Sequence, residues 1–328
     1  MKKKLEYVWP VIGLAAVVFS FWLLYKELKG ISANDVWASL GNISIGQWGL
    51  SILATFVAYG ALAWYDRIAL LHLGRKVSWV AVSLISFTTY ALSHNIGASV
   101  LSGAMVRFRA YGSLGLSLAE IGVLVALCSF TFALGTILLG GMVLVGEPEV
   151  MLRLIDAPTW IVRLAGFGLL GLVALYVLGS WREFKPLVIG KFAVYYPRLP
   201  VTFRQLFAAP LELIGAAGII YFALPEAGNP GYFVVLGVFL ASFSLALVSH
   251  APGGLGVLEF VFMNAMAGDQ LSQSDILAAL LVFRLLYLVI PLAFAIVVVI
   301  LFERSRLSEA LQGGAQANEG SKQDDRAA

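Results

Sequence analysis

The chain has 328 residues, of which 60% are hydrophobic and 12% are charged, with a formal net charge of +3 and a mean hydropathy of +0.89. Soluble domains carry roughly 25% charged residues, so this composition excludes an ordinary soluble protein. Apolar stretches of about 20 residues, the length that spans a bilayer, recur along the chain and predict an all-α polytopic membrane protein.

The predicted elements begin with a membrane span over Val8–Tyr25, which follows three lysines. No small-residue cleavage site follows this stretch, so we expect a retained helix rather than a signal peptide. The polar residues 303–328 predict a disordered cytoplasmic tail, which leaves 1–302 as the membrane domain. The other clear spans are Gln47–Tyr65, Leu118–Val145, Trp160–Gly179, Gln205–Leu224 and Ile276–Phe302.

Two further apolar stretches, Ser78–Tyr111 and Tyr232–Gly268, are long but interrupted. The first contains Ser93-His-Asn-Ile-Gly97, and the second contains Ser249-His-Ala-Pro-Gly-Gly-Leu-Gly256. Both place a Ser-His pair at the end of an apolar run and a glycine three residues after the histidine. Hydrocarbon offers no water to a broken backbone, so such breaks are expected only where protein or a wet cavity surrounds them. In transporters these places are substrate sites near the midplane, which indicates a transporter.

Loop charge predicts how the two interrupted stretches cross the membrane. With the N-terminus cytoplasmic, single crossings would put the acidic loop with Glu147 and Asp156 inside and the basic loop Trp181–Arg204 outside, against the positive-inside rule. If each stretch enters and returns, both loops move to the expected side and both termini are cytoplasmic. The sequence therefore predicts about eight membrane helices, including two oppositely oriented re-entrant hairpins, near 78–116 and 232–268, that form an inverted repeat.

The sequence lacks the motifs that are typical of several classes of protein. The sequence has no Walker loop, no nucleophile elbow and no zinc-type cluster, and its single cysteine is Cys128. The glycines of Gly253-Gly-Leu-Gly256 lie inside an apolar run and follow no predicted strand, which argues against a dinucleotide site. We therefore expect no enzyme activity, no catalytic residue, no metal, no cofactor and no nucleic acid partner.

Ionisable residues inside the apolar stretches are candidates for function, because a charge at the bilayer centre costs about 3 kcal/mol and needs a partner or water. They are Glu120, Glu212, Glu259 and Arg284. Either Glu212 or Glu259 can pair with Arg284 to hold helices together, or these residues can line a polar pathway. The second break predicts a half-helix starting near Leu255, whose free N–H groups suit phosphate. The predicted substrate-binding residues are His94, Asn95, Gly97, Arg107, Arg109, Glu212, His250, Gly253, Gly254, Glu259, Arg284 and Tyr287.

For four of these candidates, a structural role is an alternative to substrate binding. His94 and His250 can carry protons or contact a headgroup, but either can instead donate a hydrogen bond to a carbonyl freed by the break. Arg107 and Arg109 can hold phosphate, or they can mark the cytoplasmic end of the returning arm of the first hairpin.

Two signatures, in this order, resemble those of a known family. Ser93-His-Asn-Ile-Gly97 with Val106-Arg-Phe-Arg109 and Tyr111 is similar to the flippase half of the multiple peptide resistance factors, which pairs an Asn-x-Gly break with an Arg-x-Arg-x-Tyr return. The stretch Pro252-Gly-Gly-Leu-Gly-Val-Leu-Glu259, followed by Arg284-Leu-Leu-Tyr287, resembles the second signature of that family. The resemblance covers residues 1–302 and suggests the lysylphosphatidylglycerol synthetase transmembrane family.

The resemblance implies that the protein flips a phospholipid between the leaflets of a bacterial inner membrane. The lipid it suggests is aminoacylated phosphatidylglycerol or an ordinary anionic phospholipid. Members of the family carry a cytosolic aminoacyl-transferase domain, which we expect to be absent here because only the polar tail follows the last predicted span. Beyond membrane phospholipid, the predicted partners are a separate lipid-modifying enzyme and a second copy of the chain.

Two alternatives belong to other functional classes. One is a scaffold that docks a lipid-modifying enzyme without moving lipid. The other is a secondary transporter of a small anion, because inverted hairpins also serve such transporters. A groove open sideways to lipid would favour the flippase, whereas a closed central pocket would favour the small anion.

Overall fold

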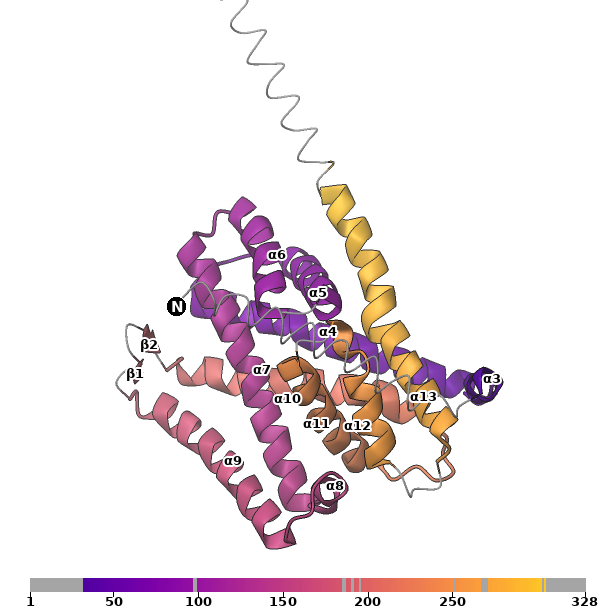
Figure 1. The fold of residues 1–328 in the computed structure, drawn as a ribbon. Coiled ribbons are helices and arrows are strands. Elements are labelled where there is room, and N and C mark those ends of the chain that lie inside the picture. The colour runs from indigo at the N-terminus through magenta and orange to yellow at the C-terminus, as the bar shows by residue number, and fades with distance from the viewer. Residues whose placement is uncertain are drawn as a thin grey trace, which may run out of the picture.

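The computed structural model describes residues 32–96, 99–184, 187–189, 192–194, 196–249, 252–266, 271–302 and 304, most of which are helical (Figure 1). Within these described residues, six helices are long and apolar enough to cross a membrane, which confirms the predicted all-α polytopic fold. The predicted span Val8–Tyr25 and nearly all of the predicted tail 303–328 lie outside the described residues.

The six candidate spans are α4 (Ile45–His72), α7 (Leu118–Gly146), α9 (Thr159–Trp181), α10 (Leu199–Ala223), α11 (Tyr232–Ser249) and Gln273–Phe302, which begins with α13 (Gln273–Phe283) and the π-helical turn η2 (Arg284–Val289). The shorter elements are α3 (Ala33–Asn42), α5 (Trp79–Ile96), α6 (Ser99–Ser113), α8 (Glu149–Leu152), the 3₁₀ turn η1 (Pro252–Gly254), α12 (Val257–Ala265) and an antiparallel pair of strands, β1 (Leu187–Ile189) and β2 (Phe192–Val194).

Serine side chains define where several helices begin. The hydroxyls of Ser44 and Ser117 accept hydrogen bonds from the third helical residue, and the side chains of Gln47 and Glu120 return to the serine N–H groups. Ser272 caps α13 in the same way. These capping boxes satisfy N–H groups that have no partner inside the helix. They explain why α4 begins before the predicted position at Gln47.

The helices meet at two ends of the molecule. At the first end, Arg67 of α4 donates a hydrogen bond of 2.7 Å to the carbonyl of Val77, just before α5. Arg75, after α4, pairs with Glu120 at the start of α7 at 2.6 Å. At the second end, Gln47 at the start of α4 donates to the carbonyl of Leu224, after α10, at 2.9 Å. Helices α4 and α10 therefore run antiparallel between the two ends.

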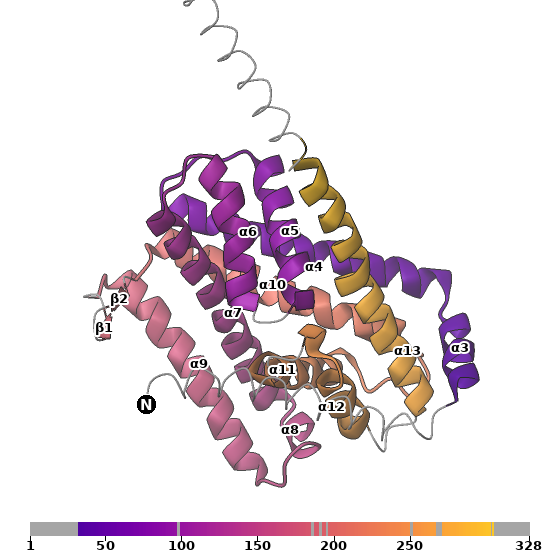
Figure 2. The same ribbon diagram turned by 45° about the horizontal axis from the view of Figure 1, so that its top comes forward.

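Helices α5 and α6 form a hairpin that starts and finishes at the first end (Figure 2). Its return is fixed by Arg107 and Tyr111 of α6, which both contact Asp66 in the last part of α4. Helices α11 and α12 form a second hairpin that starts and finishes at the opposite end, where Arg153 after α8 donates to the carbonyl of Ala265. The two hairpins thus have the opposite orientations that the loop charges predicted. Their depth in a bilayer stays a prediction.

Charged side chains differ in sign between the two ends. Arginine and lysine predominate at the first end, where Glu120 and Glu183 are also found, and carboxylates predominate at the second, where Arg153 and Arg163 are also found. The predicted cytoplasmic location of the first end rests on this distribution and stays a prediction. The described residues concerned are Arg67, Arg75, Lys76, Arg182, Arg198 and Arg204 at the first end, and Asp35, Glu147, Glu149, Asp156, Glu226 and Asp275 at the second.

Small residues let the central helices approach each other closely. A Cβ at Gly215 of α10 would lie 2.7 Å from the backbone nitrogen of Ala58 in α4. A Cβ at Gly135 of α7 would lie 2.7 Å from the Cβ of Ala209 in α10. Lipid tails are as apolar as the helix surfaces, so close packing of this kind replaces the hydrophobic drive between membrane helices. As a result α10 is the most buried of the candidate spans.

The outer surface of the described helices is apolar, as contact with lipid requires. Helix α9 is the least buried candidate span, and the C-terminal part of Gln273–Phe302 is similarly open. The exposed side chains include Leu164, Phe167, Leu172 and Leu175 of α9, and Phe294, Val297, Ile300 and Leu301 of the last helix.

Candidate functional site

A buried ion pair holds the second break together. Arg284 of η2 lies against Glu259 of α12, with its Nε and Nη2 atoms both 2.5 Å from Oε1 of the carboxylate. Nη1 of Arg284 donates to the carbonyl of Gly253 at 2.9 Å. Oε2 of Glu259 accepts a 2.9 Å hydrogen bond from the N–H of Gly256. The pair therefore ties both sides of the glycine turn to η2.

Glu259 occupies the helix end that the sequence predicted as a phosphate site. Helix α12 begins at Val257, slightly after the predicted start at Leu255, because Gly256 still has a φ of 80°. That left-handed conformation suits glycine and strains other residues. A carboxylate is favourable beside the positive end of a helix, as a phosphate would be. In this conformation a phosphate would have to displace the carboxylate of Glu259.

The tip of the first hairpin lies directly against the second break. Nδ2 of Asn95 donates to the carbonyl of Leu288 in η2 at 3.2 Å. The ring of His94 stacks on Tyr287, with ring centroids 5.3 Å apart. A Cβ on Gly253 would lie 3.9 Å from the carbonyl oxygen of His94. The π-helical turn leaves carbonyls out of the regular helical pattern, and such turns occur often at functional sites. The two breaks therefore meet at η2.

Glu212 lies beside this contact, in the middle of α10. Its Oε1 atom accepts a 2.6 Å hydrogen bond from the hydroxyl of Tyr287, and Tyr59 of α4 donates to the backbone carbonyl of the same tyrosine at 2.9 Å. The side chain is 1% exposed. Its second oxygen, Oε2, has no hydrogen-bond partner among the described residues. Glu212 is thus a buried carboxyl group that Arg284 does not reach.

Six of the predicted residues come together at this contact of the two breaks. They are His94, Asn95, Gly253, Glu259, Arg284 and Tyr287, and Glu212 lies beside them. Gly254 has a φ of 64° and packs against α11, where its Cβ would meet Ala246 at 2.9 Å. Gly97 and His250 lie outside the described residues.

The remaining two predicted residues, Arg107 and Arg109, lie on α6 toward the first end. Arg109 is exposed. Arg107 is buried in a second ion pair, with Asp66 of α4: its Nη2 atom lies 2.6 Å from Oδ1 and its Nε atom 3.2 Å from Oδ2. Tyr111 and the thiol of Cys128 also donate to this carboxylate, at 2.9 and 3.3 Å. This cluster fastens α6 and α7 to α4.

Sequence reasoning missed Asp66 because the predicted span ended at Tyr65. Helix α4 instead continues to His72, which places the carboxylate inside the helical bundle with no exposed surface. One signal was available, since the apolar run resumes directly after Arg67 with Ile68-Ala-Leu-Leu71. A charged pair inside an otherwise apolar helix indicates buried partners rather than a loop.

Glu120 is also predicted as a charge within the membrane, and this depth stays a prediction. It lies in the first turn of α7, where it caps the helix through Ser117. It also makes a two-pronged ion pair with Arg75, at 2.6 and 3.0 Å. Glu120 therefore stabilises the start of α7 at the first end of the molecule.

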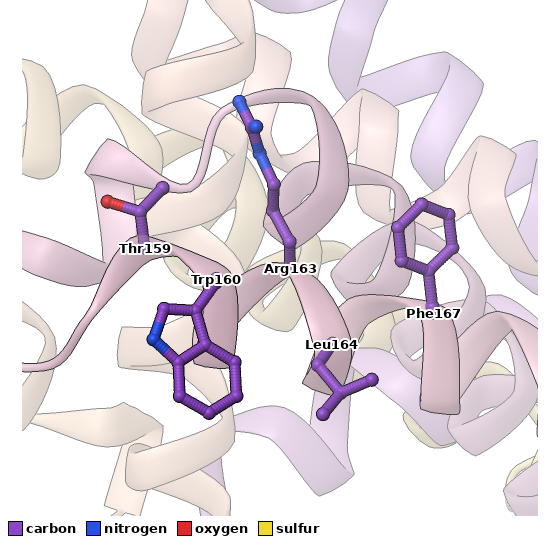
Figure 3. A pocket seen from close by; sticks show the side chains of 5 residues that line it. All are labelled: Thr159, Trp160, Arg163, Leu164 and Phe167. Atoms are coloured by element: carbon purple, nitrogen blue, oxygen red, sulfur yellow. The ribbon is translucent and has the colours of Figure 1, made fainter.

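A surface hollow of about 620 Å³ lies at the start of α9, at the second end (Figure 3). Its described lining is Thr159, Trp160, Arg163, Leu164 and Phe167, all from this one helix. Residues of the two breaks do not line it. The hollow is therefore separate from the contact of the two breaks.

Comparison with known proteins places the chain among relatives, although no family model matches it. It is 30% identical over 299 residues to the uncharacterized protein slr0712 of Synechocystis sp., covering 89% of this chain and 91% of that protein. It is also 30% identical over 292 residues to the inner membrane protein YbhN of Escherichia coli, covering 86% of this chain and 88% of YbhN. The chain belongs to the YbhN family.

This member of the YbhN family is also similar to a larger protein. It is 24% identical over 291 residues to the phosphatidylglycerol lysyltransferase of Staphylococcus aureus, which covers 86% of this chain. The same match covers 32% of the lysyltransferase. The chain thus spans about a third of that enzyme. The similarity agrees with the resemblance found in the sequence signatures.

Proposed function

We propose that this protein moves phospholipid headgroups between the leaflets of the bacterial inner membrane. The headgroup passes between the tips of the two hairpins, while the acyl chains stay in the bilayer. The observation that carries this proposal is the meeting of two oppositely oriented broken hairpins at one buried ion pair, Arg284–Glu259. The similarity to a phosphatidylglycerol lysyltransferase supports phospholipid as the class of substrate.

Arg284 is the candidate phosphate-binding residue. Guanidinium groups bind phosphate through paired hydrogen bonds, and helix N-termini bind it through free N–H groups. The N–H of Gly256 and the guanidinium of Arg284 both contact Glu259, so a phosphate that displaces this carboxylate meets both donors at once. The released Glu259 carboxylate is then the candidate partner for a cationic part of the headgroup.

Transport requires this contact to open, since the side chains of Arg284 and Glu259 are only 13% and 5% exposed. Exchange of Glu259 for a phosphate replaces the carboxylate between Gly256 and Arg284, whereas the bond from Arg284 to the carbonyl of Gly253 does not involve Glu259. Asn95 of the first hairpin contacts η2 as well, so a headgroup that enters here lies at the contact between the two tips. We infer that the closed conformation described above alternates with one in which the headgroup separates the tips.

The proposal includes an orientation and excludes catalysis. The basic first end and both chain termini face the cytoplasm, so the α5–α6 hairpin enters from the cytoplasm and the α11–α12 hairpin from the opposite side. No chemical step is assigned to the chain. A separate lipid-modifying enzyme supplies any aminoacylated substrate.

Lipid movement in proteoliposomes tests the proposal. Vesicles containing the purified protein and a headgroup-labelled lipid are treated with a reductant that bleaches only the outer leaflet. The wild-type protein should let the inner-leaflet label become accessible faster than in empty vesicles, and Arg284→Gln should lose most of this effect. Arg75→Gln, which breaks an exposed ion pair at the first end, is the matched control and should keep it.

The lipid series in this assay should include anionic, zwitterionic and aminoacylated headgroups. No movement above empty vesicles for any of them would overturn the proposal. If Arg284→Gln does not fold, Arg284→Lys keeps the charge but loses the paired geometry, and it should slow transport without abolishing it.

A scaffold for a lipid-modifying enzyme is the second candidate. It is favoured by one observation, that the chain matches only a third of a lysyltransferase and so corresponds to the part of an enzyme that works with further domains. A scaffold would retain its partner in co-purification with Arg284→Gln and Glu259→Gln alike. It would also leave lipid movement at the level of empty vesicles.

A further inference from the structure

Glu212 is the one buried carboxylate of the described region that the two ion pairs leave out. Asp66 is neutralised by Arg107 and Glu259 by Arg284. Glu212 instead receives a single hydrogen bond from the hydroxyl of Tyr287, and its Oε2 atom is buried without a partner among the described groups.

Among the residues that the structure describes, the titratable groups facing Glu212 are tyrosine hydroxyls. Tyr59 and Tyr65 approach from α4 and Tyr287 from η2. The hydroxyl of Tyr59 donates a hydrogen bond to the backbone carbonyl of Tyr287, and that of Tyr65 donates one to the backbone carbonyl of Ala209. On the other described helices packed against α10, the titratable groups lie toward helix ends or face elsewhere: Glu120 and Cys128 of α7, Arg163 and Tyr176 of α9, Tyr232 of α11 and Asp275 of α13.

This environment favours a protonated carboxyl group. An ionised carboxylate out of water needs an opposite charge and several hydrogen bonds, and without them the group takes up a proton instead. Glu212 has one hydrogen bond and no cation among its described neighbours. These are the surroundings of a carboxyl group that keeps its proton, and Oε2 is the oxygen left available to carry it.

We propose that Glu212 is a proton-binding site and that its protonation is coupled to the lipid movement described above. The coupling rests on the proposed function, whereas the proton site does not. In the closed conformation the carboxyl O–H bond is intact. When the site opens to water, the bond breaks, the electron pair stays on the carboxylate, and the proton passes to water. Closure from the other side returns a proton from water to the same oxygen.

The η2 turn connects this proton site to the proposed phosphate site. Arg284 and Tyr287 both belong to the six-residue turn η2. Arg284 holds Glu259 and Tyr287 holds Glu212, so a movement of η2 disturbs both carboxyl groups together. His94 of the first hairpin stacks on Tyr287, and its buried Nδ1 atom also lacks a hydrogen-bond partner among the described groups.

Infrared spectroscopy tests the proton site without any transport measurement. A protonated carboxylic acid gives a carbonyl stretching band that carboxylates do not give, and this band shifts in heavy water. The purified wild-type protein near neutral pH should show the band, and Glu212→Gln should lose it. Glu226→Gln, the same substitution on an exposed carboxylate at the second end, should keep it.

Tyr287→Phe provides a second readout if Glu212→Gln fails to fold. Removing the donor to Oε1 should move the band to higher frequency while leaving it present. A band that is absent from the wild-type protein, or that survives in Glu212→Gln, would overturn the proton site.

Lipid movement under a pH gradient tests the coupling. Wild-type proteoliposomes should change their transport rate several-fold when a gradient is imposed, and Glu212→Gln should lose this response. An equal response in both proteins would overturn the coupling. If the infrared band behaves as expected but no lipid moves in any vesicle, the proposed function and the coupling fail together while the proton site stands.

Discussion

Replacing Gly215 by alanine should destabilise the protein, even though alanine is the better helix former. The added Cβ would lie 2.7 Å from the nitrogen of Ala58 and 2.8 Å from the carbonyl oxygen of Ala54. Ordinary contact begins near 3.4 Å, so α4 and α10 have to separate by about 0.7 Å (3.4 − 2.7) at their crossing. Both obstacles are backbone atoms, which a side-chain rotation cannot relieve.

Gly218→Ala is the matched control on the same helix. Its added Cβ would lie 3.4 Å from the side chain of Ala54, which is an ordinary contact. Each substitution gains roughly 1 kcal/mol of helix propensity, so this gain cancels when the two variants are compared. Overpacking costs about 1–3 kcal/mol. The Gly215→Ala protein should therefore be less stable than Gly218→Ala by about 1–3 kcal/mol.

Unfolding in mixed micelles of increasing denaturing detergent, followed by circular dichroism, measures this difference. The transition of Gly215→Ala should come at lower detergent than that of the wild type, and that of Gly218→Ala at the same or higher detergent. A Gly215→Ala protein as stable as Gly218→Ala would refute the close packing of α4 on α10. It would also remove the physical support for the position of Glu212, one helical turn away.

Three further predictions follow from the buried polar groups. Glu259→Gln or Arg284→Gln alone should cost about 3 kcal/mol in the same unfolding measurement, because each leaves a buried partner uncompensated, and the double variant should lose clearly less than the sum. Asp66→Asn should cost a similar amount by leaving Arg107 buried without its counter-ion, and near wild-type stability would contradict that assignment. The thiol of Cys128, which is 3% exposed, should resist a membrane-permeable maleimide until the protein is unfolded, as judged by a mass shift.

Local features of the sequence were enough to predict the second break. Proline and glycines in Pro252–Gly256 cannot continue a helix, and the structure turns there with positive φ at Gly253, Gly254 and Gly256. The opposite orientations of the two hairpins followed from loop charge alone. The loop charges could be used in this way because membrane insertion depends on properties of short segments, namely apolarity and flanking charge, and the side from which each hairpin enters stays a prediction.

Pairing of charges could not be predicted in the same way. The sequence left open whether Glu212 or Glu259 pairs with Arg284, and the structure pairs Glu259. The sequence also predicted Arg107 as a candidate phosphate ligand, whereas in the structure Arg107 forms an ion pair with Asp66. Partners that are 25 and 41 positions apart in the chain meet only when separate helices pack together. A local pattern of residues therefore cannot predict which of them pair.

The amino-acid sequence by itself determined that this is an all-α membrane protein with two interrupted hairpins, since each of these features depends on a stretch shorter than one span. Only the tertiary structure decided that the tip of the first hairpin meets the second break at η2, and that Glu212 has no cation among its described neighbours there. The physical reason is that close packing through Gly135 and Gly215 brings α7 and α4 against α10, and this packing sets which buried groups can reach each other.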